Sequence, residues 1–82
     1  MAQLTILYFA RVAETMGRTS EIIDRPDGVM TLGALADWIE ENGGNLGERA
    51  KLRGAIDQQM AGMDAQLNDA QEVAFFPPVT GG

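Results

Sequence analysis

The sequence contains no cysteine and no histidine, and its only lysine is Lys51. Without cysteine the chain cannot form a disulfide or supply a thiol nucleophile. A zinc site would have to use Asp and Glu alone, which is unusual. General acid–base chemistry near neutral pH would depend on a carboxylate or lysine with a shifted pKa. We therefore expect the chain to bind no metal and no cofactor, and to have no self-contained active site.

Long apolar runs are also missing. No stretch approaches the roughly 20 apolar residues that cross a bilayer, and the amino terminus lacks the pattern of a secretory signal. With 12 acidic and 6 basic side chains among 82 residues, the net charge is −6. Such a surface repels the phosphate backbone of nucleic acids and favours basic protein surfaces. We expect one small cytoplasmic domain with no membrane and no nucleic-acid partner.

Hydrophobic periodicity predicts an α+β fold, in which a mixed sheet of about five strands carries one main helix across it. Thr31 can cap the main helix, and Gly43 and Gly44 end it. One stripe of this helix is apolar and is expected to be buried, and it consists of Leu32, Leu35, Ala36 and Ile39. The expected strands are residues 3–9, 19–24, 52–56, 59–62 and 72–76; the main helix is 31–42, and 10–17 forms one or two helical turns.

Smaller features give further expectations. Both faces of the first strand are apolar toward Phe9, which predicts a central strand covered on both sides. Residues 25–28 read as a turn with Pro26 in its second position and Gly28 at positive φ. Trp38 is expected at the edge of the core, and Met60 and Met63 are expected to be packing residues.

The last eight residues, Phe75-Phe76-Pro77-Pro78-Val79-Thr80-Gly81-Gly82, form the most informative segment. The prolines cannot donate hydrogen bonds to a sheet, so they end the last strand and stiffen the chain beyond it. Residues 77–82 could then extend about 20 Å from a domain formed by residues 1–76. Glycines without a β-carbon can enter a narrow channel and leave the terminal carbonyl open to attack.

Two interpretations of this ending remain open from the residues alone. The simpler interpretation is a plain binding domain with a frayed end, because terminal glycines are often just disordered. The other is a carrier, a folded domain whose Gly82 carboxylate is activated and used by other proteins. A carboxylate must first become an anhydride such as an acyl-adenylate, and the chain has no Gly-x-x-x-x-Gly-Lys-Ser/Thr phosphate loop. A partner would therefore supply the ATP chemistry. Two aromatics and a stiff spacer before the glycines favour the carrier.

The segment from Glu72 to Gly82 resembles the carboxyl terminus of the small subunits of molybdopterin synthase. The opening from Leu4 to Val12, the chain length and the place of the main helix resemble the same family. The chain departs from the family pattern at Asp57, where Asn is common, and at Asp69-Ala70-Gln71-Glu72, where Asp-Gly-Asp-Glu is common. Both departures bear on turn geometry and lie away from the tail.

The resemblance implies a ubiquitin-like β-grasp fold and the role of a sulfur carrier in molybdenum cofactor biosynthesis. A ubiquitin-activating-type adenylyltransferase would adenylate Gly82 with ATP and Mg²⁺, and a sulfur donor protein would convert it to a thiocarboxylate. The tail would insert into the large subunit of a heterotetrameric synthase, a sulfurtransferase, and donate sulfur to cyclic pyranopterin monophosphate. The implied site residues are Gly82 and Gly81 for the chemistry, and Pro77, Pro78, Val79 and Thr80 for insertion.

A partner surface can also be predicted. If the first and last strands are neighbours, Leu7, Phe9 and Phe76 form one apolar patch beside the base of the tail, typical of an interface. The alternative is that these residues pack under the segment 10–17. The basic residues expected to meet a partner are Arg11, Arg49, Lys51 and Arg53. A related carrier of the thiazole synthesis type and a ubiquitin-like protein modifier remain as alternative functions.

Overall fold

A computed structural model describes residues 3–78 of the chain. The strands are β1 (Gln3–Tyr8), β2 (Ser20–Asp24), β3 (Arg53–Ile56), β4 (Gln59–Ala61) and β5 (Glu72–Phe76). The helices are α1 (Ala10–Met16), α2 (Leu32–Glu41) and the short 3₁₀ helix η1 (Arg49–Lys51). The predicted α+β fold and its five strands are confirmed, and η1 is an addition. Neither α-helix within residues 3–78 is long and apolar enough to cross a membrane.

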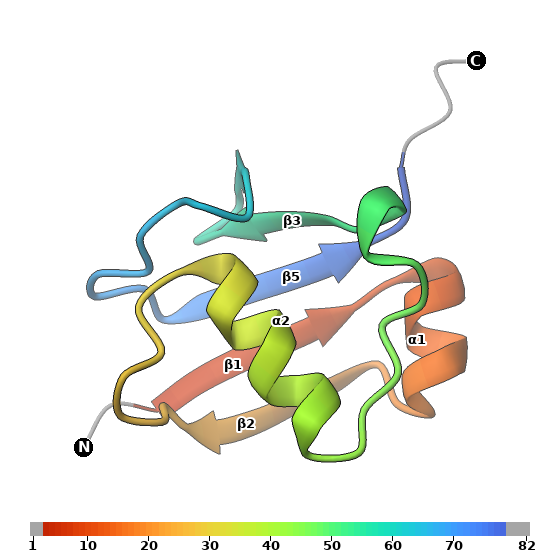
Figure 1. The fold of residues 1–82 in the computed structure, drawn as a ribbon, viewed down its shortest axis with the longest axis horizontal. Coiled ribbons are helices and arrows are strands. Elements are labelled where there is room, and N and C mark those ends of the chain that lie inside the picture. Colours follow the sequence, from red (N-terminus) through yellow and green to blue (C-terminus); the bar gives the residue numbers. More distant parts are fainter. Residues whose placement is uncertain (1–2, 79–82) are drawn as a thin grey trace.

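The sheet has the strand order β2-β1-β5-β3-β4 (Figure 1). The central strand β5 is parallel to its neighbour β1, with Tyr8 opposite Phe75. The remaining pairs are antiparallel, so β2 and β4 form the edges as arms of two hairpins. Because β1 and β5 run in the same direction, both end at the same edge of the sheet. The chain therefore leaves β5 beside the start of α1.

Helix α2 is set by its caps and its apolar stripe. The Thr31 hydroxyl accepts a hydrogen bond from the Ala34 N–H at 3.1 Å, as a capping residue should. The four predicted stripe residues are all buried, and Gly43 follows the helix at φ 96°. In the first turn, the Gly33 N–H donates to the Met63 carbonyl at 2.7 Å. A β-carbon at Gly33 would lie 3.0 Å from that oxygen, which explains a glycine at a position where helix propensity disfavours it.

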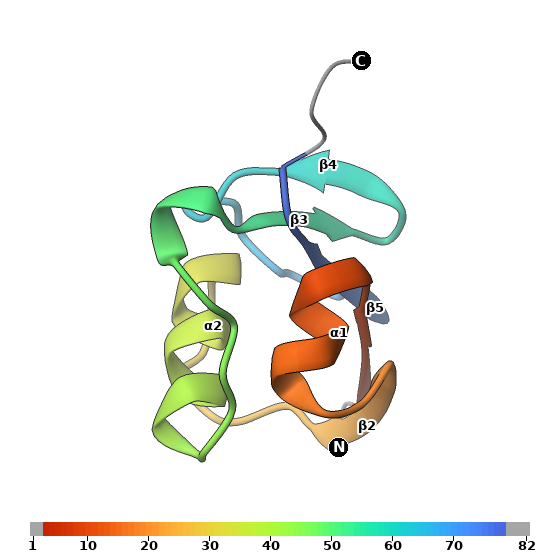
Figure 2. The same cartoon turned by 90° about the vertical axis from the view of Figure 1, so that its right-hand side faces the viewer.

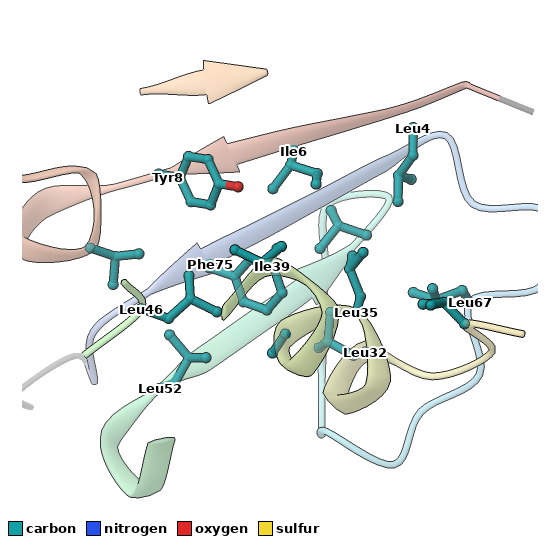
Figure 3. Close-up of a cluster of buried hydrophobic side chains, with 14 residues drawn as sticks. Leu4, Ile6, Tyr8, Leu32, Leu35, Ile39, Leu46, Leu52, Leu67 and Phe75 are labelled. Atoms are coloured by element: carbon teal, nitrogen blue, oxygen red, sulfur yellow. The ribbon is translucent and has the colours of Figure 1, made fainter. Parts of the chain in front are cut away.

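The core lies between α2 and the sheet (Figure 3). Tyr8 and Phe75, register partners on β1 and β5, stack with ring centroids 6.4 Å apart and planes 15° from parallel. Trp38 and Met63 pack partly buried against the core, as predicted. The fully buried members with the largest side chains are Tyr8, Phe75, Leu4, Ile6, Leu32, Leu35, Leu67 and Val73.

Both α-helices lie on one side of the sheet (Figure 2). Val12 of α1 is 5% exposed and belongs to the same core cluster as the residues of α2. The opposite side, here called the outer face, is not covered by either helix. The prediction that β1 is covered on both sides near Phe9 is therefore wrong, because Phe9 is 48% exposed. The segment 10–17 does not bury the outer face, since Val12 belongs to the core cluster and Ala13 and Met16 pack against it.

Two turns refine the local predictions. The Val29 N–H donates to the Pro26 carbonyl at 3.3 Å, which places Pro26 in the first position of the turn and not in the second. Gly28 has φ 85°, as predicted. At the β3–β4 turn, a carboxylate oxygen of Asp57 accepts the N–H groups of Gln71 and Glu72, each at 3.0 Å. The two departures from the family pattern therefore meet at one hydrogen-bonded corner.

Candidate functional site

The candidate site is the region where β5 ends. Phe76 is the last strand residue, and the strand stops at Pro77 as the missing proline N–H requires. Figures 1 and 2 show the chain leaving the sheet there, flanked by α1 and η1. Pro77 and Pro78 are half-buried. The predicted site residues Val79, Thr80, Gly81 and Gly82 lie outside the described residues, so their roles stay predictions.

A groove of about 330 Å³ opens at the base of the tail. We call it the tail-base groove. One wall comes from α1, one from the loop that leads into η1, and one from the two prolines. Its basic residues are Arg11 and Lys51, and Glu48 is its acidic residue. The full lining is Arg11, Val12, Thr15, Leu46, Gly47, Glu48, Lys51, Leu52, Pro77 and Pro78.

The chain enters α1 through an unusual backbone conformation. Phe9 is extended, at φ −123° and ψ 151°, and Ala10 follows at φ 52°. A non-glycine residue in this left-handed region costs of order 1–3 kcal/mol and is held only by its surroundings. The Phe9 N–H donates to the Phe75 carbonyl at 3.1 Å, which ties this corner to β5. The turn at Ala10 leaves Phe9 on the outer face, while Arg11 lines the tail-base groove.

The structure brings the three predicted interface residues to one region of the outer face. Leu7 is opposite Ala74 in the parallel pair, on the side away from the core residues Tyr8 and Phe75. Phe76 lies two residues after Ala74 and thus on the same face. Leu7 and Phe76 are half-buried, whereas Phe9 is 48% exposed. The grouping is as predicted, and its use as an interface stays a prediction.

Two further apolar residues of the outer face were missed by sequence reasoning. Met60, predicted to be a packing residue, is 69% exposed, so that prediction is wrong. It pairs with Ala55, which pairs with Ala74 and so shares the cross-strand row of Leu7. Ile22 is 65% exposed and pairs with Thr5, two residues before Leu7. Only the sheet register shows that these side chains share a face with the predicted patch.

The four basic residues predicted to meet a partner differ in their surroundings. Arg49 binds Asp37 and Glu40 of α2, each at 2.8 Å, and so attaches η1 to that helix. Arg53 is opposite Phe76 in the register and donates to the carbonyls of Ala50 and Leu52. The charge of Arg49 is thus neutralised by ion pairs within the fold. The other three surround the tail base.

The Tyr8 phenol has a strongly shifted pKa, and its contacts show that it stabilises the fold and takes no part in the candidate site. Its hydroxyl donates to the Glu21 carboxylate at 2.6 Å, and Arg18 binds the other Glu21 oxygen at 2.9 Å. Burial, followed by the hydrogen bond to Glu21, raises the pKa of the Tyr8 phenol far above its ordinary value. The group stays neutral and joins β1 to β2. Its ring belongs to the core side of the sheet, opposite the outer face.

A protein-family model described as the ThiS family matches residues 6–82 of this chain. The chain belongs to the ThiS family. Among the relatives of this ThiS-family chain is the molybdopterin synthase sulfur carrier subunit of Escherichia coli, 37% identical over 84 residues, with 96% of this chain and 99% of that protein covered. The protein of the same description from Haemophilus influenzae is 33% identical over 82 residues, with the same coverage. The predicted family resemblance is confirmed.

The fold of this ThiS-family chain is also found in solved structures. Small archaeal modifier protein 1 of Haloferax volcanii superposes with a TM-score of 0.68 at 24% identity. The match covers 99% of this chain and 100% of that one. At this identity the likeness shows the fold alone, and it confirms the ubiquitin-like β-grasp predicted from the sequence.

Proposed function

We propose that this chain is the sulfur carrier and small subunit of a molybdopterin synthase. The observation that carries the proposal is the end of β5 at Phe76, where two prolines lead away from the sheet toward the terminal Gly-Gly. Relatives at 33% and 37% identity named as molybdopterin synthase sulfur carrier subunits support it. In this proposal residues 1–76 form the scaffold, and residues 77–82 form the arm that enters a partner.

The chemistry proposed for the arm takes place at the Gly82 carbonyl. A ubiquitin-activating-type adenylyltransferase joins the carboxylate to the AMP part of ATP, with Mg²⁺, and pyrophosphate leaves. Sulfide supplied by a donor protein then displaces AMP from the carbonyl carbon and gives the Gly82 thiocarboxylate. In the synthase, a heterotetramer with the large subunit, this sulfur is transferred to cyclic pyranopterin monophosphate, and two transfers complete the dithiolene. ATP and Mg²⁺ belong to the activating partner.

The outer face is the proposed docking surface for these partners. Phe9 and Phe76 supply aromatic side chains beside the tail, Met60 extends the apolar surface to the edge strand β4, and aromatic residues are common anchors of interfaces. Phe76→Ala should weaken binding of the large subunit while the domain stays folded. An equal loss of binding and thermal stability would assign Phe76 to the core instead.

Removing the reactive residue tests the function directly. Deletion of Gly82 should abolish molybdopterin formation in a reconstituted synthase while the unfolding temperature stays unchanged. Gly81→Leu should block insertion, because a side chain enters a channel sized for glycine. Gly62→Ala is the matched glycine control, since its β-carbon would meet only the Asp64 carboxylate, at 3.2 Å. Normal product formation by the chain without Gly82 would refute the proposal.

A second candidate function is that of a protein modifier, which the terminal Gly-Gly also fits. Intact-mass measurement of the chain from cells separates the two. A carrier gains one sulfur in place of one oxygen at its terminus, whereas a modifier is found joined through Gly82 to lysines of other proteins. A related carrier of the thiazole synthesis type would show the same sulfur but would complement only strains that lack that pathway.

A further inference from the structure

Resting on the proposed function, we propose that the tail-base groove binds an acidic segment of the partner protein that takes up the tail. This segment would close around Pro77 and Pro78, and its binding site is distinct from the outer face. It assigns Arg11 and Lys51 as the residues that recognise this segment. Both line the groove together with the two prolines.

The charge of the molecule is unevenly distributed. The chain carries 12 acidic and 6 basic side chains, for a net charge of −6. Nevertheless four of the six basic residues, Arg11, Arg49, Lys51 and Arg53, belong to the first turn of α1, to η1 and to the start of β3. These are the segments that flank the exit of β5 (Figure 1). The tail therefore leaves an acidic domain through its most basic region.

Most of this positive charge is not neutralised within the fold. Arg49 is committed to two carboxylates of α2. Arg53 donates to backbone carbonyls, which carry no net charge. Lys51 lies 3.8 Å from Glu48, but the two side chains are 70% and 74% exposed, so the pair is weak. Among residues 3–78, no ion pair joins Arg11 to an acidic side chain. Basic charge at the groove is thus available to a partner.

The position of the groove indicates a protein segment as its occupant. Residues 77–82 can span about 20 Å, so the reacting carbonyl lies deep in a partner while the groove lies at the rim of the channel. Whatever admits the tail must place its rim against Arg11 and Lys51. The buried side chains of Val12, Leu46 and Leu52 add apolar walls, which suit a peptide segment better than a small hydrated anion. Complementary charge at this rim would orient the approaching chain so that its tail enters the partner first.

The test compares two double variants that lower the net charge equally. Arg11→Gln with Lys51→Gln removes two cations from the groove. Gln3→Glu with Gln66→Glu adds two anions at exposed positions on other segments. Association with the large subunit of molybdopterin synthase from the same organism is followed by stopped flow between 20 mM and 500 mM NaCl, a range over which salt increasingly screens the exposed charges. Thermal unfolding verifies that both variants are folded.

Steering of this kind raises association rates by about 10- to 1,000-fold at low salt. We expect the groove variant to associate about tenfold more slowly than the wild type at 20 mM NaCl, and to lose much of the salt dependence. The charge-matched control should keep a wild-type slope. Superimposable salt curves for the groove variant and the control would overturn the inference. A wild-type chain that does not bind the large subunit at all would instead overturn the proposed function.

A small anion in the groove is the competing occupant. Association is therefore repeated in sodium phosphate and in NaCl at equal ionic strength. Equal rates in the two salts support a protein segment, because only general screening is then at work. Slower association in phosphate than in chloride, absent from the groove variant, would show that the groove binds phosphate and would overturn the assignment.

Discussion

Phe9 donates a backbone hydrogen bond to Phe75, but the two side chains lie on opposite faces of the sheet. The same substitution at each position can therefore separate an effect on docking from an effect on folding. Phe75 is 0% exposed and stacks on Tyr8, whereas Phe9 is 48% exposed on the outer face. Full burial of such a side chain stabilises by about 1.5–3 kcal/mol, so half-buried Phe9 contributes about 1 kcal/mol. Phe75→Ala should cost about 3–5 kcal/mol because a core cavity is left behind.

For a domain of this size, a loss of 1 kcal/mol lowers the unfolding temperature by about 4–8 °C. Phe9→Ala should therefore remain folded at 25 °C, while Phe75→Ala loses a large part of the total stability. The loss of affinity for the large subunit should follow the opposite order: among molecules that remain folded, Phe9→Ala should lose more affinity than Phe75→Ala. An aromatic anchor contributes about 2 kcal/mol or more, so Phe9→Ala should raise the Kd for the large subunit about thirtyfold.

Urea unfolding and calorimetric titration of the two variants measure both quantities. The decisive comparison is the ratio of binding loss to stability loss at Phe9. If Phe9→Ala destabilises the domain as much as Phe75→Ala, then Phe9 is a core residue and the account of two faces is incorrect. If it costs neither stability nor affinity, the outer face near Phe9 is not the docking surface.

Substitutions at three further positions test the fold. The Tyr8 pKa is raised above 10.0 by burial and by Glu21, so its stabilising effect is complete below pH 10 and is lost as the pH rises beyond it. Urea midpoints from pH 8 to 11.5 should therefore fall at the alkaline end for the wild type and less steeply for Tyr8→Phe. Gly54→Ala should cost about 1–3 kcal/mol in urea unfolding, because its β-carbon would lie 2.6 Å from a Leu32 methyl. Asp57→Ala should cost about 1–2 kcal/mol by loss of two hydrogen bonds, while Asp57→Asn, which keeps an acceptor oxygen, should unfold like the wild type.

The elements with strong local signals were predictable from the sequence. Helix α2 has a capping threonine, an apolar stripe and two terminal glycines, and each acts within a few residues of its neighbours. The end of β5 was predictable because proline has no N–H to donate, whatever the surrounding fold. The grouping of Leu7, Phe9 and Phe76 needed one assumption, that β1 and β5 are adjacent, and the parallel pair satisfies it.

The features that were missed depend on contacts between distant segments. Arg49 binds Asp37 and Glu40 across the loop that joins α2 to η1, a contact that no local pattern marks. Gly54 is a weak strand residue by propensity, yet it is required where β3 passes directly beneath Leu32. In both cases the chemistry of the residue is visible in the sequence, but its partner is not.

Met60 illustrates why the extent of the outer face could not be predicted. Strand β4 has only three residues, so its alternation is too short to indicate which side chain points inward. Its orientation is set by pairing with Ala55, which lies in the row of Leu7 across β5. A shift of one residue in this register would turn Met60 toward the helix side. The apolar surface beside the tail is therefore a property of the sheet pairing, and any substitution that alters the β3–β4 register should change docking without touching the tail.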